Sequence, residues 1–113
     1  MDLFVEIIVY RLKSGSGSDF HRIMLNESLP LHRSAGIRVL ESRQSADDPD
    51  GYCLVRAFES LARLRKDQDE FYASAAWREG PRQRIIDCIE TTVSVVLEMT
   101  ELQVSALGEY KLS

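Results

Sequence analysis

Four side chains could bind or position a small molecule: Tyr10, His32, Tyr72 and Trp77. An unperturbed imidazole titrates near neutral pH, so His32 could move a proton, or it could be a surface group in the last turn of a helix. Each tyrosine could hydrogen-bond a ligand or lie at the edge of the core with its hydroxyl in water. Trp77 could stack on a planar ligand or fill a corner between helices. These residue types identify candidates for ligand binding, but they leave the catalytic residues unknown.

The sequence lacks the motifs of metal, dinucleotide and phosphate chemistry. His21 and His32 do not share a helix face at ligand spacing, and two separate cysteines do not form a metal site. No dinucleotide glycine fingerprint is present, and residues 13–18, KSGSGS, lack the Lys-Ser/Thr ending of a phosphate loop. We therefore expect no metal and no other cofactor.

Length and composition predict one globular domain. The chain has 113 residues, of which 44% are hydrophobic, and a net charge of −4. Such a charge gives no support for nucleic-acid binding, which favours a basic surface. No apolar run approaches the roughly 20 residues of a membrane span, and no signal peptide is evident. We expect a reduced, cytoplasmic protein whose two cysteines are unpaired.

The periodicity of the apolar residues predicts an α+β domain over residues 1–99 and a C-terminal tail over residues 100–113. The expected elements are a strand at 3–12, a helix at 19–34, strands at 37–44 and 52–58, helical segments at 61–74 and 82–90 separated by a break at 75–80, and a strand at 91–99. Ser18 would be the N-cap of the first helix, and Pro30 would interrupt it. Short right-handed connections favour the ferredoxin-like split βαβ arrangement, with a four-stranded antiparallel sheet and the helices on one face.

The strand at 3–12 is apolar on both faces, which predicts a central strand covered on both sides. We assign the more uniformly apolar face, which includes Val5 and Val95, to the layer beneath the helices. The other face mixes apolar, aromatic and charged residues, as protein interfaces do, and predicts a homodimer with the sheets face to face. Its interface residues would be Phe4, Glu6, Ile8, Leu54, Arg56, Phe58 and Val96. Glu6 and Arg56 could form an ion pair there, or both could reach the sheet margin and stay solvated.

Three segments resemble the NIPSNAP family of the dimeric α+β barrel superfamily, which also holds the antibiotic-biosynthesis monooxygenases. They are EIIVYRLKSG at 6–15, LPLHRSAG at 29–36 and FYASAAWREGPR at 71–82. The resemblance implies a dimer formed sheet to sheet. Ile8 departs from the family, whose strand often has arginine at this position. The family's activity is largely undefined, so the resemblance specifies a fold rather than a reaction.

Three functions remain open. The first is a homodimeric module that binds a small apolar or aromatic ligand in a pocket between sheet and helices, lined by Ile23, Met24, Phe71 and Tyr72. The second is a cofactor-free monooxygenase or isomerase acting on a small aromatic or polyketide-like compound, an idea that rests on analogy of fold. The third is a purely structural subunit.

Overall fold

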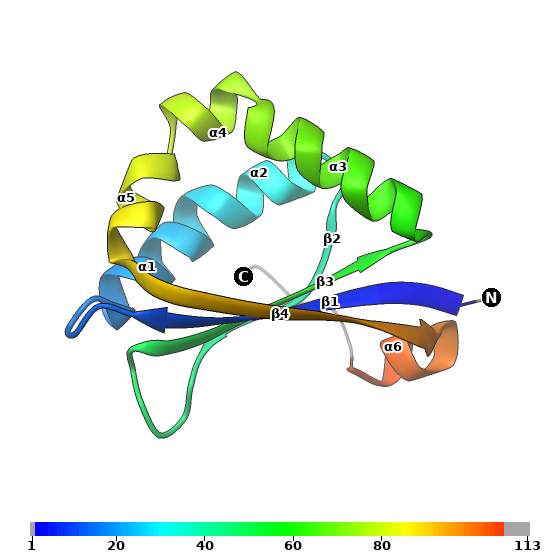
Figure 1. The fold of residues 1–113 in the computed structure, drawn as a ribbon, viewed down its shortest axis with the longest axis horizontal. Coiled ribbons are helices and arrows are strands. Elements are labelled where there is room, and N and C mark those ends of the chain that lie inside the picture. Colours follow the sequence, from blue (N-terminus) through cyan, green and yellow to red (C-terminus); the bar gives the residue numbers. More distant parts are fainter. Residues whose placement is uncertain (1, 108–113) are drawn as a thin grey trace.

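The computed structural model describes residues 2–107 as one sheet with helices on both sides (Figure 1). In chain order the elements are β1 (Asp2–Leu12), α1 (Gly17–Ile23), the π-helical turn η1 (Met24–Ser28), α2 (Leu29–Ser34), β2 (Arg38–Gln44), β3 (Gly51–Phe58), α3 (Leu61–Ala73), α4 (Ala75–Glu79), α5 (Arg82–Cys88), β4 (Ile89–Thr100) and α6 (Glu101–Leu107). None of the helices in this part of the chain is long and apolar enough to cross a membrane.

The four strands form one antiparallel sheet in the order β2-β3-β1-β4. β1 is therefore an inner strand between β3 and β4, as the sequence predicts. Helices α1 to α5 lie on one side of the sheet, and α6 lies on the other (Figure 1). This arrangement confirms the predicted ferredoxin-like α+β fold, but the prediction of helices on one face alone is wrong for α6 (Figure 1).

The first helical region runs from α1 through η1 into α2. Pro30 lies in the first turn of α2, where its missing N–H does not cost a hydrogen bond. Inside a regular α-helix its ring would clash with the carbonyl four residues earlier, and the wider turn at η1 precedes it. The predicted interruption is thus a π-helical turn rather than a break. Gly36, at φ +75°, ends the region in the left-handed conformation that glycine tolerates.

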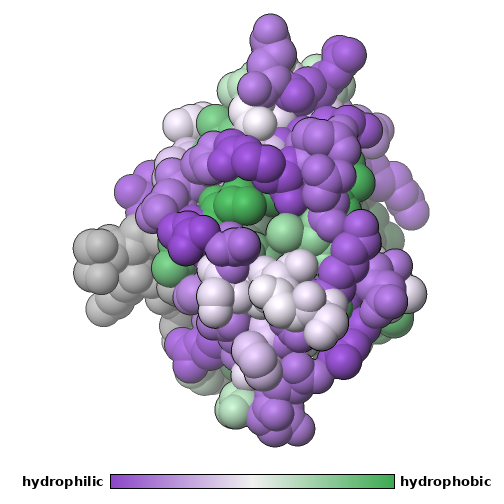
Figure 2. All heavy atoms as spheres, turned by 90° about the vertical axis from the view of Figure 1, so that its left-hand side faces the viewer, coloured by the Kyte–Doolittle hydropathy of each residue, from purple (hydrophilic) through white to green (hydrophobic). Residues whose placement is uncertain are grey.

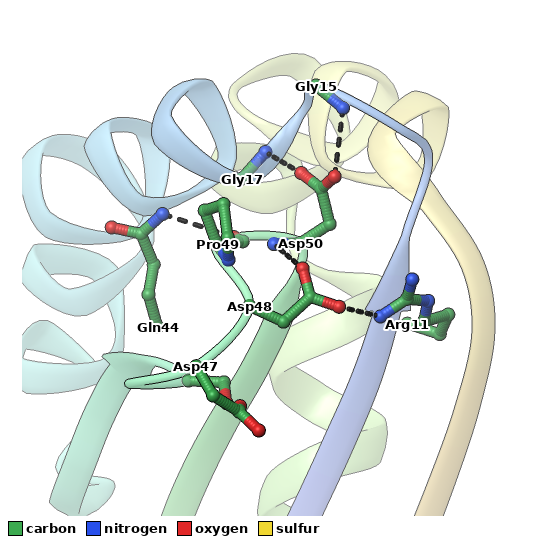
Figure 3. Close-up of polar contacts among 9 residues, drawn as sticks. Arg11, Gly15, Gly17, Gln44, Asp47, Asp48, Pro49 and Asp50 are labelled. Carbon is green, nitrogen blue, oxygen red and sulfur yellow. Dashed lines mark hydrogen bonds and ion pairs between the residues drawn. The ribbon is translucent and has the colours of Figure 1, made fainter.

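The loop between β2 and β3 folds onto the loop that begins α1 (Figure 3). The Asp50 carboxylate accepts hydrogen bonds from the backbone N–H groups of Gly15, at 3.0 Å, and Gly17, at 2.9 Å. Gly17 is packed so closely that a Cβ atom there would lie 1.7 Å from the Pro49 carbonyl oxygen. The helix begins at Gly17, so the prediction that Ser18 is its N-cap is wrong. A carboxylate from a distant loop satisfies the backbone donors instead.

The two faces of the sheet are used in the opposite way to that predicted. The main core lies between the sheet and helices α1 to α5 and contains Ile8, Leu12, Phe20, Met24, Leu29, Ile37, Tyr52, Leu54, Phe58, Leu64, Phe71, Trp77 and Ile85. The predicted interface residues Phe4, Glu6, Ile8, Leu54, Arg56, Phe58 and Val96 all point to this helix-covered side. The prediction was wrong because it took the polar groups on this face as a sign of an interface. Side chains from the helices satisfy those groups inside the subunit.

The face opposite the main helices is apolar and only partly covered. Val104 of α6 is fully buried there against Leu3, Val5, Leu40 and Ala57. The predicted tail therefore contributes a packed helix up to Leu107, and residues 108–113 lie outside the described part of the chain. Beyond α6 the face is open: Val9, Val93, Val95 and Leu97 are 52%, 68%, 50% and 43% exposed.

Candidate functional site

A buried ion pair lies at the centre of the helix-covered face. Glu6 of β1 is the direct cross-strand partner of Arg56 of β3. Arg56 donates to Glu6 Oε1 from Nε, at 3.0 Å, and from Nη2, at 2.5 Å. Arg56 is 1% exposed and Glu6 is 8% exposed. The predicted ion pair is confirmed, within one subunit, and the alternative of two solvated charges is wrong.

Helix α3 supplies two further polar groups to this ion pair. Gln68 Nε2 donates to Glu6 Oε1 at 2.7 Å, and Arg56 Nη1 donates to Tyr72 Oη at 2.8 Å. Sequence reasoning did not single out Gln68. The available signal was its spacing of four residues from Tyr72, which places both side chains on one face of a helix.

His32 completes the cluster as a neutral hydrogen-bonding group. A carbonyl can only accept, so His32 Nδ1 donates to the Ser28 carbonyl at 2.8 Å. A guanidinium can only donate, so His32 Nε2 accepts from Arg56 Nη1 at 3.1 Å. Burial, helped by the charge of Arg56, lowers the pKa of His32 to about 4. Both ring nitrogens are occupied, so the geometry favours a structural role for His32 over proton transfer.

The same contacts fix the charge of Arg56. Burial alone would lower the pKa of its guanidinium, but Tyr72, Glu6 and Tyr10 around it raise that pKa above its ordinary value. The ring of Tyr72 also lies 5.7 Å from the guanidinium carbon. Arg56 is therefore a permanent buried cation whose donors are directed at Glu6, His32 and Tyr72.

Trp77 lies at the corner where α3 gives way to α4. Ser74 ends α3, and its hydroxyl oxygen accepts a hydrogen bond from the backbone N–H of Trp77, which caps α4. The indole is 7% exposed, with ring centroids 5.2 Å from Tyr72 and 5.5 Å from Phe71. Trp77 therefore fills the corner and packs edge to face against the ring of Tyr72.

Tyr10 lies on the same face but packs toward β3 and α1. Its ring centroid is 5.3 Å from that of Phe20 and 6.4 Å from that of Tyr52. Burial raises the pKa of the Tyr10 phenol well above its ordinary value. The Tyr52 hydroxyl joins a separate polar group with Ser42, at 2.8 Å, and His21, at 2.7 Å. The structure thus brings His32, Tyr72 and Trp77 together and places Tyr10 at their edge.

An open pocket of about 870 Å³ lies beside Tyr72. Its lining residues come from the arc of α3, α4 and α5: Tyr72, Ala73, Ala75, Arg78, Glu79 and Arg82. Tyr72 is 37% exposed, in contrast to its buried partners Arg56 and His32. Seen from the side where α5 leads into β4, hydrophobic residues are set back among hydrophilic ones (Figure 2). Of the four residues predicted to line a pocket, Met24 and Phe71 are core residues, Ile23 packs against that core, and Tyr72 faces this pocket.

Within residues 2–107, no group of three or more His, Cys, Asp and Glu side chains could hold a metal ion. Cys53 and Cys88 are free and half-buried, and burial raises the pKa of both thiols. The polar groups of the Arg56 cluster therefore act on one another as hydrogen-bond donors and acceptors.

The fold is a ferredoxin-like α+β domain of the kind found in solved structures of NIPSNAP proteins and of a putative antibiotic biosynthesis monooxygenase. A NIPSNAP domain protein from Burkholderia xenovorans is 20% identical, with a TM-score of 0.74 over 83% of this chain and 91% of that one. A NIPSNAP family protein with unknown function from Agrobacterium tumefaciens is 22% identical, with a TM-score of 0.78 over 87% and 88%.

A third similar structure carries the name "Putative antibiotic biosynthesis monooxygenase" and comes from Nitrosomonas europaea. It is 23% identical, with a TM-score of 0.64 over 83% of this chain and 95% of that one. No family model and no curated protein matches the sequence. The predicted resemblance to NIPSNAP proteins is confirmed by these structures at the level of the fold.

Proposed function

We propose that the protein binds a small aromatic molecule in the pocket beside Tyr72 and works as a homodimer. One observation carries the binding proposal. The Tyr72 hydroxyl oxygen accepts from Arg56, so its own hydrogen remains to be donated, and no acceptor for it is found among the described residues. The other polar groups around Arg56 are engaged with one another.

The setting of Tyr72 suits recognition of a planar ligand with an acceptor oxygen. Its ring is held by Trp77 and Phe71, so its position is fixed before a ligand arrives. Preformed pockets with aromatic walls and a few placed polar groups are typical of small-molecule sites. A phenol, ketone or quinone oxygen could accept the free hydrogen of Tyr72 while the ligand ring packs in the pocket.

The homodimer proposal rests on the open half of the outer sheet face. Val9, Val93, Val95 and Leu97 form an exposed apolar stripe along the β1–β4 pair. Contiguous apolar patches on a subunit mark interaction surfaces. A second copy placed on this stripe by a twofold axis would bury the same residues on both sides. This is the face opposite to the one that the sequence pattern favoured.

A second candidate is a cofactor-free monooxygenase or isomerase. Its support is the name of the Nitrosomonas structure together with the Arg56–Tyr72 pair, which could stabilise an oxyanion that forms on a bound substrate. The engaged nitrogens of His32 weigh against the acid–base role that this idea gave to it. Binding without catalysis therefore remains the first choice.

The test combines native mass spectrometry of the purified protein with thermal melting across a library of small aromatic compounds. We expect a retained ligand, or compounds that raise the Tm of the wild type and raise it less in Tyr72→Phe, which loses only the hydroxyl. Tyr10→Phe is the matched control and should respond like the wild type. An empty protein that no compound stabilises, or equal responses of wild type and Tyr72→Phe, would overturn the proposal.

A further inference from the structure

We infer that the pocket beside Tyr72 has an anion subsite formed by Arg78 and Arg82, so that its ligand is an aromatic carboxylate rather than a neutral ring. The inference rests on the proposed function and adds the charge of the ligand to it. Both arginines line the same pocket as Tyr72, one from α4 and one from the first position of α5.

The tight turn between the two short helices brings these arginines together. At Gly80 a Cβ atom would lie 2.3 Å from the Ala76 carbonyl oxygen, so only glycine permits this close approach of the backbone. Pro81 follows and fixes the chain at the start of α5. The sequence WREGPR thus places two cations on either side of one turn, facing one cavity.

The two arginines differ from most others in this acidic protein, because they have no carboxylate partner among residues 2–107. Seven other arginines form ion pairs with acidic side chains there, namely Arg11, Arg22, Arg38, Arg43, Arg56, Arg63 and Arg84. Lys66 pairs in the same way with Glu70. In a chain of net charge −4, two unpaired guanidinium groups in one pocket leave a local positive charge. Guanidinium groups bind carboxylates through paired hydrogen bonds.

Glu79 lines the same pocket and is the one acidic residue in its lining. It forms no ion pair with Arg78 or Arg82, so the lining carries two positive charges and one negative charge. An anionic ligand would balance that excess, whereas a cationic ligand would meet two like charges. Glu79 also provides a test of the sign of the ligand's charge, because neutralising Glu79 should strengthen the binding of an anion.

The experiment compares 2-naphthoate with 2-naphthamide, which share a ring system and differ in charge. Binding is followed by NMR on the full-length 15N-labelled protein through the indole N–H of Trp77, a single resonance because the sequence has one tryptophan. Trp77 packs against Tyr72, with the ring centroids 5.2 Å apart, so its signal reports on a ligand that contacts Tyr72. We expect 2-naphthoate to bind at least tenfold more tightly than 2-naphthamide.

Variants assign that preference to the two arginines. The double variant Arg78→Gln/Arg82→Gln should bring the ratio of the two affinities close to one, and Glu79→Gln should raise it. Arg65→Gln removes an arginine of α3 that has no ion pair within residues 2–107 and lies outside the pocket lining, so its affinity ratio should equal that of the wild type.

The outcomes separate the two proposals. If both compounds bind at Trp77 with equal affinity, or if the double variant keeps the preference, the anion subsite is overturned and the aromatic pocket survives. If neither compound shifts the Trp77 signal, the anion subsite and the proposed aromatic pocket both fail for this ligand size.

Discussion

At the scale of single residues, the Glu6–Arg56 pair organises the interior polar groups. Removing one partner of a buried ion pair leaves an uncompensated charge, which costs roughly 3–5 kcal/mol of folding stability. We expect Glu6→Gln and Arg56→Met each to lower the free energy of unfolding by about that amount. The loss of unfolding free energy in the double variant should be smaller than the sum of the two single losses, because neither charge remains. Urea denaturation of the four proteins measures this coupling, and additive losses would show that the pair is not coupled.

The neutral state of His32 predicts a pH dependence of stability. Its ordinary pKa of 6.5 falls to about 4 in the folded protein. Below pH 6.5 the unfolded chain binds a proton that the folded chain does not bind until about pH 4. The free energy of unfolding should therefore fall by roughly 1.4 kcal/mol for each unit by which the pH is lowered within that interval. Burial lowers the pKa of His21 too, which adds a contribution of the same sign.

Urea denaturation at pH 7.0, 5.5 and 4.5 measures this slope. The variant His32→Gln should be less stable at pH 7 and should lose most of the slope, whereas His21→Gln should lose only the smaller part that His21 contributes. An unchanged slope in His32→Gln would show that His32 is not the buried neutral group.

Sequence reasoning identified the residues of this cluster better than their roles. It paired Glu6 with Arg56 because both fall on one face of neighbouring strands. It could not find Gln68 or the contact between His32 and Arg56, because those contacts depend on how the helices lie over the sheet. The packing role considered for Trp77 agrees with its place at the corner.

At the scale of elements, the start of α1 depends on a loop 33 residues further along the chain. Replacing Asp50 by Ala would leave the N–H groups of Gly15 and Gly17 without their shared acceptor. Lost hydrogen bonds of this kind cost about 1–2 kcal/mol. Asp47→Ala is the matched control, since Asp47 contacts only the Ser45 hydroxyl in the described hydrogen bonds. Urea denaturation should show a lower free energy of unfolding for Asp50→Ala and no change for Asp47→Ala. Equal stability of the two variants would contradict this role.

The order of elements up to β4 could be read from the chain because most of them have an apolar period, and Gly, Pro or Ser residues mark many of their boundaries. Ser60 caps α3 as such a boundary should, by accepting from the Arg63 N–H. The beginning of α1 escaped detection because its capping group is supplied by tertiary structure. Ser18 has the right side chain for a cap, but it lies inside the first turn of a helix that already begins at Gly17.

At the scale of the molecule, the sequence pattern could not decide which face of the sheet the helices cover, since both sides of β1 are apolar.

The exposed apolar stripe on the outer face leads to a prediction about assembly. Val95→Asp should leave the subunit folded, because Val95 is half-exposed in a single chain, and should convert the proposed dimer to monomers. Sedimentation velocity measures the mass, and circular dichroism measures the fold. Arg65→Asp on α3 is the control and should stay dimeric, while an unchanged mass for Val95→Asp would remove this stripe as the interface.

Helix α6 has a consequence for how two copies could meet. It occupies the end of the outer face near Leu3 and Val5, so a second copy has access only to the end near Val9 and Val93. Helix α6 would then act as a spacer that permits one alignment of the two sheets and blocks sliding between them. Removing the residues after Met99 should enlarge the exposed apolar surface and let two copies associate in several alignments.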